Sequence, residues 1–249
     1  MNAFDVKNKT ALVTGANRGI GLAYVESLIQ QGAGKVYACA RDANALENLD
    51  ALNATHNTTV VEAVLLDVTS TEDIQALKEK VSTLDLLINN AGVIHGSFFC
   101  SDNAVDLTDQ QMQTNYYAPL HLIQAFLTPL KQSKGAIVNV CSIAGISSFP
   151  GLGPYSVTKA ALHSLTQGLR IELSGDGVLV AGVYPGPVDT RMAADYELEK
   201  APPSQIAERT LNALLKGETD IFPDAFSEQM YGLFLNHPGE LEKAFAEMH

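Results

Sequence analysis

The chain has 249 residues, enough for one large α/β domain, and its 46% hydrophobic content is typical of a folded protein. The formal net charge of −12 argues against a nucleic-acid partner, because phosphate backbones are bound by clustered Lys and Arg, and against docking on an anionic membrane. No apolar run reaches the roughly 20 residues of a membrane-spanning helix, and residues 1–10 lack the apolar core of a signal peptide. Cys39, Cys100 and Cys141 form no disulfide framework or metal motif, so we expect a protein of the reducing cytoplasm.

Strand and helix patterns alternate along the chain. Short apolar runs predict strands at 10–14, 35–40, 59–66, 84–89, 135–142 and 178–184. Helical patterns run from the turn after the first strand to about 31, then over 43–52, 71–81, 108–131 (with Pro119 expected to kink it) and from Tyr155 to about 173. Less regular patterns predict a helix at 203–216, an edge strand at 220–222 and short helices at 226–236 and 240–247. This order predicts a single, doubly wound, parallel Rossmann-type α/β/α domain, with 187–249 as substrate lid and C-terminal tail.

A glycine-rich turn follows the first strand, with Gly15, Gly19 and Gly21 spaced Gly-x-x-x-Gly-x-Gly. Between a strand and a helix, such glycines let the backbone approach a pyrophosphate, and the helix N-terminus presents free N–H groups to it. The alternative is an ordinary tight turn. The flanking elements favour a dinucleotide site.

The second strand ends in Ala40-Arg41, where an NAD-binding protein of this type would carry an acidic residue. Arg41 and Arg18 are instead suited to a ribose phosphate, because guanidinium groups present forked donors and remain charged. We therefore predict NADPH over NADH. The alternative is that Arg41 pairs with Asp42 on the surface.

Tyr155 and Lys159 are four residues apart and therefore share one face of a helix. A nearby ammonium group favours the phenolate and lowers the pKa of a tyrosine, which makes the pair a proton donor and acceptor for carbonyl–alcohol interconversion. The same spacing also occurs on solvated helices, so the other motifs decide between the two readings.

Taken together, these motifs resemble the short-chain dehydrogenase/reductase family, and in particular its NADP-preferring, carbonyl-reductase-like members. The matching segments are Thr14 to Gly21, Asp67-Val68, Asn89-Asn90-Ala91-Gly92, Asn115, Ser142, Tyr155 to Lys159, and Pro185 to Thr190. They span about three quarters of the chain in the family's order.

The resemblance implies a role for each matching residue. The cofactor, NADP(H), would be bound by Thr14, Gly15, Asn17, Arg18, Gly19, Ile20, Gly21, Arg41, Asp67, Val68, Asn89, Ala91, Gly92, Tyr155, Lys159, Pro185, Gly186, Val188 and Thr190. Tyr155 would act as general acid and base, Ser142 would stabilise the carbonyl oxygen, Lys159 would assist Tyr155, and Asn115 would hold a water of a proton relay.

Several of these residues have simpler interpretations. Ser142 ends a strand and could cap the next segment, and Asn115 could lie on a solvated helix face. Cys141, next to Ser142, has no histidine nearby in sequence, so we interpret it as core packing. His95, His121 and His163 show no metal-ligand spacing, and we expect no metal site.

Phe149, Leu152, Met192 and Tyr196 are expected to form a lipophilic substrate pocket. The predicted substrate is a small-to-medium, mostly apolar ketone or aldehyde, or the matching secondary alcohol. Two alternatives stay open: an NAD-dependent alcohol dehydrogenase and a non-catalytic NADP(H)-sensing protein. The family's usual pairing of helices implies a homodimer or homotetramer. The C-terminal portion departs from the family pattern, so we expect a short last strand and a differently packed tail.

Overall fold

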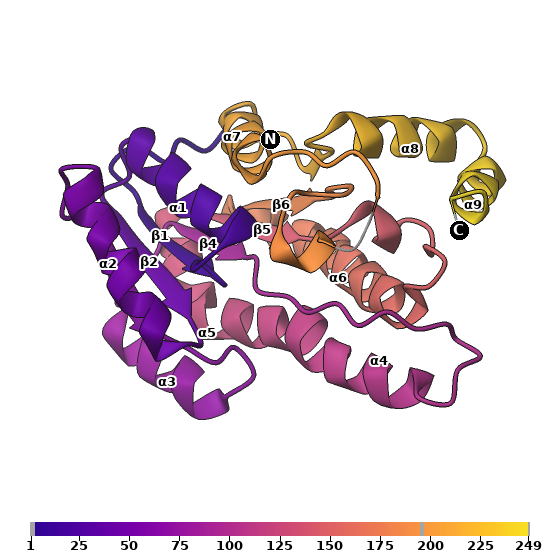
Figure 1. The fold of residues 1–249 in the computed structure, drawn as a ribbon. Helices are drawn as coiled ribbons and strands as arrows, with labels where there is room; N and C mark the ends of the chain where they lie inside the picture. The colour runs from indigo at the N-terminus through magenta and orange to yellow at the C-terminus, as the bar shows by residue number, and fades with distance from the viewer. Residues whose placement is uncertain (1–2, 195–196, 249) are drawn as a thin grey trace.

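The computed structural model of the chain describes residues 3–194 and 197–248. The described residues form one seven-stranded parallel sheet with the order β3-β2-β1-β4-β5-β6-β7 (Figure 1). The strands are β1 (Thr10–Thr14), β2 (Lys35–Ala40), β3 (Val61–Leu65), β4 (Leu86–Asn89), β5 (Ala136–Val140), β6 (Leu179–Val183) and β7 (Asp220–Ile221). The predicted Rossmann-type α/β architecture is therefore confirmed.

Helices cover both faces of the sheet (Figure 1). They are α1 (Gly19–Gln30), α2 (Leu46–Thr55), α3 (Thr71–Lys80), α4 (Ala104–Met112), α5 (Ala118–Ser133), α6 (Gly153–Glu172), α7 (Pro203–Leu215), α8 (Ala225–Asn236) and α9 (Pro238–Ala246). The central strands β4, β5 and β6 are buried at every residue, as a parallel sheet covered on both faces requires, whereas the edge strands β3 and β7 are partly exposed.

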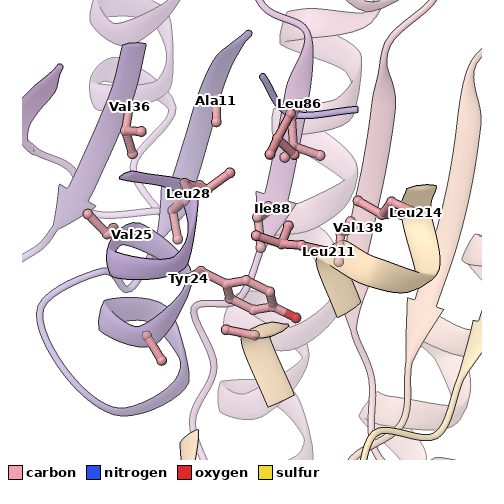
Figure 2. Close-up of a cluster of buried hydrophobic side chains, with 14 of the residues drawn as sticks. Ala11, Tyr24, Val25, Leu28, Val36, Leu86, Ile88, Val138, Leu211 and Leu214 are labelled. Atoms are coloured by element: carbon pink, nitrogen blue, oxygen red, sulfur yellow. The ribbon is translucent and has the colours of Figure 1, made fainter. Parts of the chain in front are cut away.

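One face of the sheet is covered by α1, α2 and α7. Leu86 and Ile88 of β4 point to this side, where α7 contributes Leu211 (Figure 2). Tyr24 of α1 is fully buried between the helices, and its hydroxyl bonds the Thr210 hydroxyl of α7 at 2.9 Å. This bond satisfies the polar end of a ring that otherwise packs among apolar side chains.

The opposite face is covered by α3, α5 and α6. Leu87, between the two β4 residues above, points to this side because strand side chains alternate. Phe126 of α5 is fully buried against it. The alternation fixes the register of the central strands, and so fixes which residues emerge at their carboxyl ends.

The predicted helix 108–131 is in fact three consecutive pieces. A π-helical turn, Gln113–Tyr117, separates α4 from α5. Pro119 was expected to kink the helix, and the irregular turn lies directly before it. Since Pro119 lacks an N–H, the carbonyl of Asn115 loses its regular i+4 donor, which favours the wider turn at this place.

The segment 187–249 is not the single lid and tail that the sequence predicts. Its helix α7 belongs to the main core, and β7 completes the sheet. Helices α8 and α9, at the C-terminal end of the chain, lie outside these layers and pack in a separate apolar cluster (Figure 1). β7 is two residues long, which agrees with the prediction of a short last strand. Among the described helices, none combines the length and apolarity that a membrane crossing demands.

Candidate active site

A cavity of about 810 Å³ opens at the carboxyl ends of the central strands. In the sheet, β1 lies between β2 and β4, so the strand order reverses direction at β1. Parallel α/β sheets bind ligands at such a reversal of strand order, because the loops diverge there and leave a crevice. The cavity is lined by the glycine turn, the loops after β4, β5 and β6, and the start of α8.

The glycine turn forms one end of the cavity. Gly15 and Gly19 have φ angles of +63° and +55°, which side chains with a Cβ rarely adopt. A Cβ on Gly21 would collide with the Gly15 carbonyl oxygen. The N-terminus of α1 has no side-chain cap and no acidic residue in its first turn. Its free N–H groups and positive dipole end therefore suit an anion, which fits a dinucleotide pyrophosphate.

Thr14 and Asn90 brace this turn from behind. The Thr14 hydroxyl accepts the N–H groups of Asn90 and Ala91, both at 3.0 Å, and the Asn90 side chain donates to the Thr14 carbonyl at 2.8 Å. Thr14 is buried and does not line the cavity, whereas Asn90 does. The turn is therefore tied to the loop after β4.

Asn89 was expected to line the cofactor groove, and the structure contradicts this placement. Its side chain is buried within the sheet and donates to the Asn139 side chain of β5 at 2.9 Å. Asn139 in turn donates to Thr166 of α6 at 2.9 Å. Strand alternation sends Asn89 into the core, so it only braces the sheet.

Two arginines, Arg18 and Arg41, line the cavity. The Ala16 N–H donates to the Cys39 carbonyl at 2.9 Å, which holds the glycine turn against the end of β2. Arg18 and Arg41 are consequently both exposed along the cavity. No ion pair joins Arg41 to Asp42 among residues 3–194 and 197–248, and the Asp42 carboxylate instead accepts the Asn44 N–H at 3.0 Å.

Asp67 and Val68 also line the cavity, close to Arg41. The Asp67 carboxylate accepts the Thr69 hydroxyl at 2.7 Å and the Thr69 N–H at 2.9 Å. These two hydrogen bonds are the main reason that the pKa of Asp67 is lowered, and the positive charge of Arg41 lowers it further. Asp67 is therefore a fixed anion whose geometry is set by the turn after β3.

The proposed catalytic side chains converge beyond the glycine turn. Tyr155 and Lys159 come from α6, and Ser142 follows β5; all three line the cavity. The Lys159 ammonium lies 5.7 Å from the centre of the Tyr155 ring and donates to the Val140 carbonyl at 2.8 Å. Lys159 is only 4% exposed, and burial lowers its pKa from 10.5 to about 8.

Ser142 also caps the segment that follows it, which was the simpler interpretation of this residue. Its hydroxyl oxygen accepts the Ala144 N–H at 3.2 Å at the start of the 3₁₀ turn Ile143–Gly145. A Cβ on Gly145 would lie 2.7 Å from the backbone of Lys159, so glycine lets this turn pack directly on α6. Accepting that bond leaves the Ser142 hydrogen available to a ligand.

Asn115 lies behind Lys159 and does not line the cavity. It is fully buried, which contradicts the solvated-face alternative. Its amide accepts the Val93 N–H at 2.9 Å, donates to the Val93 carbonyl at 2.9 Å, and donates to the Thr158 hydroxyl at 3.0 Å. A Cβ on Gly92 would be 3.2 Å from the Asn115 Oδ1 and 3.7 Å from the Lys159 Nζ. Asn115 and Lys159 thus meet at Gly92.

The remaining predicted cofactor residues also line the cavity: Asn17, Ile20, Ala91, Gly92, Pro185, Gly186, Val188 and Thr190. Of the predicted substrate residues, Phe149, Leu152 and Met192 line it, and Tyr196 falls outside the described residues. The residues lining the cavity that sequence reasoning missed include Ile94, His95, Arg191 and Phe226. Ile94 and His95 lie two and three residues after the Asn-Asn-Ala-Gly motif, which was the available signal, while Phe226 comes from the distant tail.

The other candidate groups play structural roles. Cys141 is buried, and burial raises the pKa of its thiol to about 12, consistent with core packing. His163 bonds the Tyr184 hydroxyl at 2.7 Å. Within the described parts of the chain, no cluster of three or more His, Cys, Asp or Glu could hold a metal ion.

A family sequence model for short chain dehydrogenases matches residues 9–201. An uncharacterized oxidoreductase of Staphylococcus saprophyticus is 36% identical over 218 residues, covering 84% of this chain and 92% of the relative. The chain belongs to the short-chain dehydrogenase family. It is therefore an oxidoreductase of this family.

Solved structures agree with this assignment. A short-chain dehydrogenase from Burkholderia cenocepacia in complex with NADP superposes with a TM-score of 0.89 at 29% identity, covering 97% of this chain and 99% of that one. A bulky-bulky ketone specific alcohol dehydrogenase from Comamonas testosteroni gives a TM-score of 0.78 at 27% identity, with 94% of each chain covered. The similarity thus extends over nearly the whole chain, beyond the residues that the family model matches.

Proposed function

We propose that this short-chain dehydrogenase transfers hydride between NADP(H) and a small-to-medium, mostly apolar ketone or aldehyde, or the matching secondary alcohol. The observation that carries the proposal is the single cavity in which Tyr155, Lys159 and Ser142 lie beyond the glycine turn. A continuous cavity of this kind lets one ligand span the anion site and reach the proton donor.

The residues at the glycine turn fit a dinucleotide with a 2′-phosphate. The uncapped N-terminus of α1 would bind the pyrophosphate, and Arg18 and Arg41 would bind the 2′-phosphate. Cys39 and Ala40 close β2 without a carboxylate, so no negative charge there repels that phosphate. The structural neighbour from B. cenocepacia holds NADP, which supports the same choice for this chain.

The chain's own residues hold and move the proton. When bound, the cofactor supplies the hydride. Tyr155 donates its hydroxyl proton to the carbonyl oxygen, and Lys159 stabilises the phenolate that results because its ammonium lies beside the ring. Ser142 donates a hydrogen bond to the same oxygen, where negative charge develops. Asn115 fixes the loop at Val93 and lies, like Lys159, close to Gly92, where it would hold a relay water.

The substrate end is mostly apolar. Phe149, Leu152 and Met192 line it together with Ile94 and Phe226. Such walls favour uncharged carbonyl compounds, and the ketone-specific neighbour from C. testosteroni supports a ketone as substrate.

We also propose a cytoplasmic homodimer. The outer side of α6 exposes Val157 and Ile171, which are 41% and 78% exposed, and Tyr117 beside α5 is 40% exposed. Family resemblance assigns these helices to subunit pairing. All three cysteines are free, which suits a reducing compartment.

Tyr155→Phe tests the reaction. The variant removes the transferable proton and keeps the ring, so we expect turnover to fall at least a hundred-fold while the NADPH dissociation constant stays within about two-fold. Tyr37→Phe, on β2 and outside the cavity lining, is the matched control and should behave as wild type. Near-wild-type turnover in Tyr155→Phe would refute the mechanism. Binding of NADPH without reduction of any carbonyl compound would instead favour a sensor.

A further inference from the structure

The C-terminal helices are connected directly to the cavity wall. Asp224, which is 3% exposed, begins α8 by accepting the Ser227 N–H at 2.8 Å. Its second carboxylate oxygen accepts the Gly186 N–H at 2.9 Å. Gly186 lies in the loop after β6 that lines the cavity. The first turn of α8 is therefore held in place against this loop.

Phe226, two residues further along, is a wall of the cavity. A Cβ on Gly186 would lie 2.6 Å from the Phe226 ring, so the ring packs directly against the glycine backbone. The position of the ring thus depends on how α8 starts.

Phe149 forms a second aromatic wall from the loop before α6. Behind it lies Phe245 of α9, with ring centres 5.1 Å apart and planes at 60°, an edge-to-face arrangement. Phe245 is fully buried and does not line the cavity. It packs with Leu241, Met230 and Ile143, and Ile143 begins the 3₁₀ turn that follows Ser142.

We propose that α8 and α9 set the substrate preference of this enzyme by building an aromatic wall from Phe226 and Phe149. Phe245 is the positioning residue that holds the Phe149 ring. The wall selects ketones that carry an aromatic or alicyclic ring, because ring faces and edges pack on such a surface better than a short aliphatic chain does. This inference rests on the proposed carbonyl reduction and adds the substrate class.

A double-mutant cycle separates positioning from general stability. The readout is the ratio of kcat/KM for acetophenone to that for butanone with NADPH, in wild type, Phe245→Leu, Phe149→Ala and the double variant. Phe245→Leu should lower the ratio about three- to ten-fold and change butanone reduction little. In the Phe149→Ala background, the same substitution should have no further effect, because the ring that it positions is gone.

Phe126→Leu is the matched control, since Phe126 of α5 is equally buried but packs against the sheet and does not line the cavity. It should leave the ratio unchanged. Equal loss for both ketones, or an undiminished effect of Phe245→Leu in the Phe149→Ala background, would overturn the proposal. If Phe245→Leu does not fold, Phe245→Met removes the ring with a flexible side chain that fills irregular space, and it carries the same expectation.

Calorimetric binding of acetophenone to the NADP⁺-loaded protein repeats the cycle without turnover, because the oxidised cofactor carries no hydride to donate. A wild type that reduces neither ketone, but whose affinity for acetophenone falls in Phe245→Leu, would refute the proposed reaction and retain the aromatic wall. Reduction of both ketones with no change in the ratio would refute the wall and retain the reaction.

Discussion

The buried Lys159 should lower the stability of the protein without its cofactor. The ammonium is 4% exposed, and its only hydrogen bond within the described residues is to the Val140 carbonyl at 2.8 Å. Burial lowers its pKa from 10.5 to about 8. This difference corresponds to roughly 3 kcal/mol of stability lost at neutral pH.

The sign of the pH dependence follows from proton uptake. Below about pH 8, both the folded and the unfolded chain carry the proton, and the full penalty applies. Between about 8 and 10.5, the unfolded chain binds more protons than the folded chain, so this residue makes stability rise with pH. The penalty should therefore shrink by about 2–3 kcal/mol between pH 7 and pH 10.

Urea unfolding of wild type and Lys159→Met at several pH values between 7 and 10 measures this effect. The free-energy difference between the two should change by about 2–3 kcal/mol over that range, in favour of wild type as the pH rises. The unpaired Val140 carbonyl in the variant adds a cost that does not depend on pH and so cancels. Lys78→Met, at an exposed position on α3, should follow wild type at every pH. Parallel curves for wild type and Lys159→Met would refute the buried, destabilising lysine.

Three further predictions concern the supports of the site. Thr14→Val keeps the shape but leaves two backbone N–H groups without their 3.0 Å acceptor, so urea unfolding should show about 2–4 kcal/mol of destabilisation, and a loss under 0.5 kcal/mol would contradict the brace. Asn115→Ala removes the hydrogen bonds to the N–H and the carbonyl of Val93, so the free energy of unfolding should fall by about 2–4 kcal/mol. The kcat should also drop, and an unchanged kcat would exclude a relay role. Mass spectrometry after iodoacetamide treatment at neutral pH should show that the exposed Cys100 is alkylated and that Cys39 and Cys141 are protected. The two buried thiols are protected because burial raises the pKa of each to about 12. Modification of Cys141 in the folded protein would contradict its role in core packing.

Sequence patterns predicted most of the elements because each strand is short, apolar and bounded by turn residues. β1 and β2 begin and end at the predicted residues, and the other strands differ only at their ends. The Tyr155–Lys159 spacing correctly placed both groups on one face of α6, because helical periodicity is a local property.

The errors involve contacts that local patterns do not encode. Asn89 and Asn90 have the same side chain and are adjacent in sequence. The alternation of side chains along the strand sends Asn89 into the core and Asn90 to the cavity. Thr14 directly precedes the glycine turn in the sequence, yet its side chain is buried and its hydroxyl accepts bonds from the loop after β4. Phe226 packs on Gly186, 40 residues earlier, and Phe245 packs on Phe149, 96 residues earlier, so no local motif indicates either of them.

A comparison of NADPH and NADH binding tests the central claim most directly. Purified protein is titrated with each cofactor at a fixed ionic strength, alongside Arg41→Ala and Arg18→Ala. A charge-assisted hydrogen bond contributes about 1.5–3 kcal/mol. Each variant should therefore bind NADPH about ten- to a hundred-fold more weakly than wild type and bind NADH unchanged. Wild type that binds NADH as tightly as NADPH would contradict the assignment of the two arginines and of NADP(H) as the cofactor.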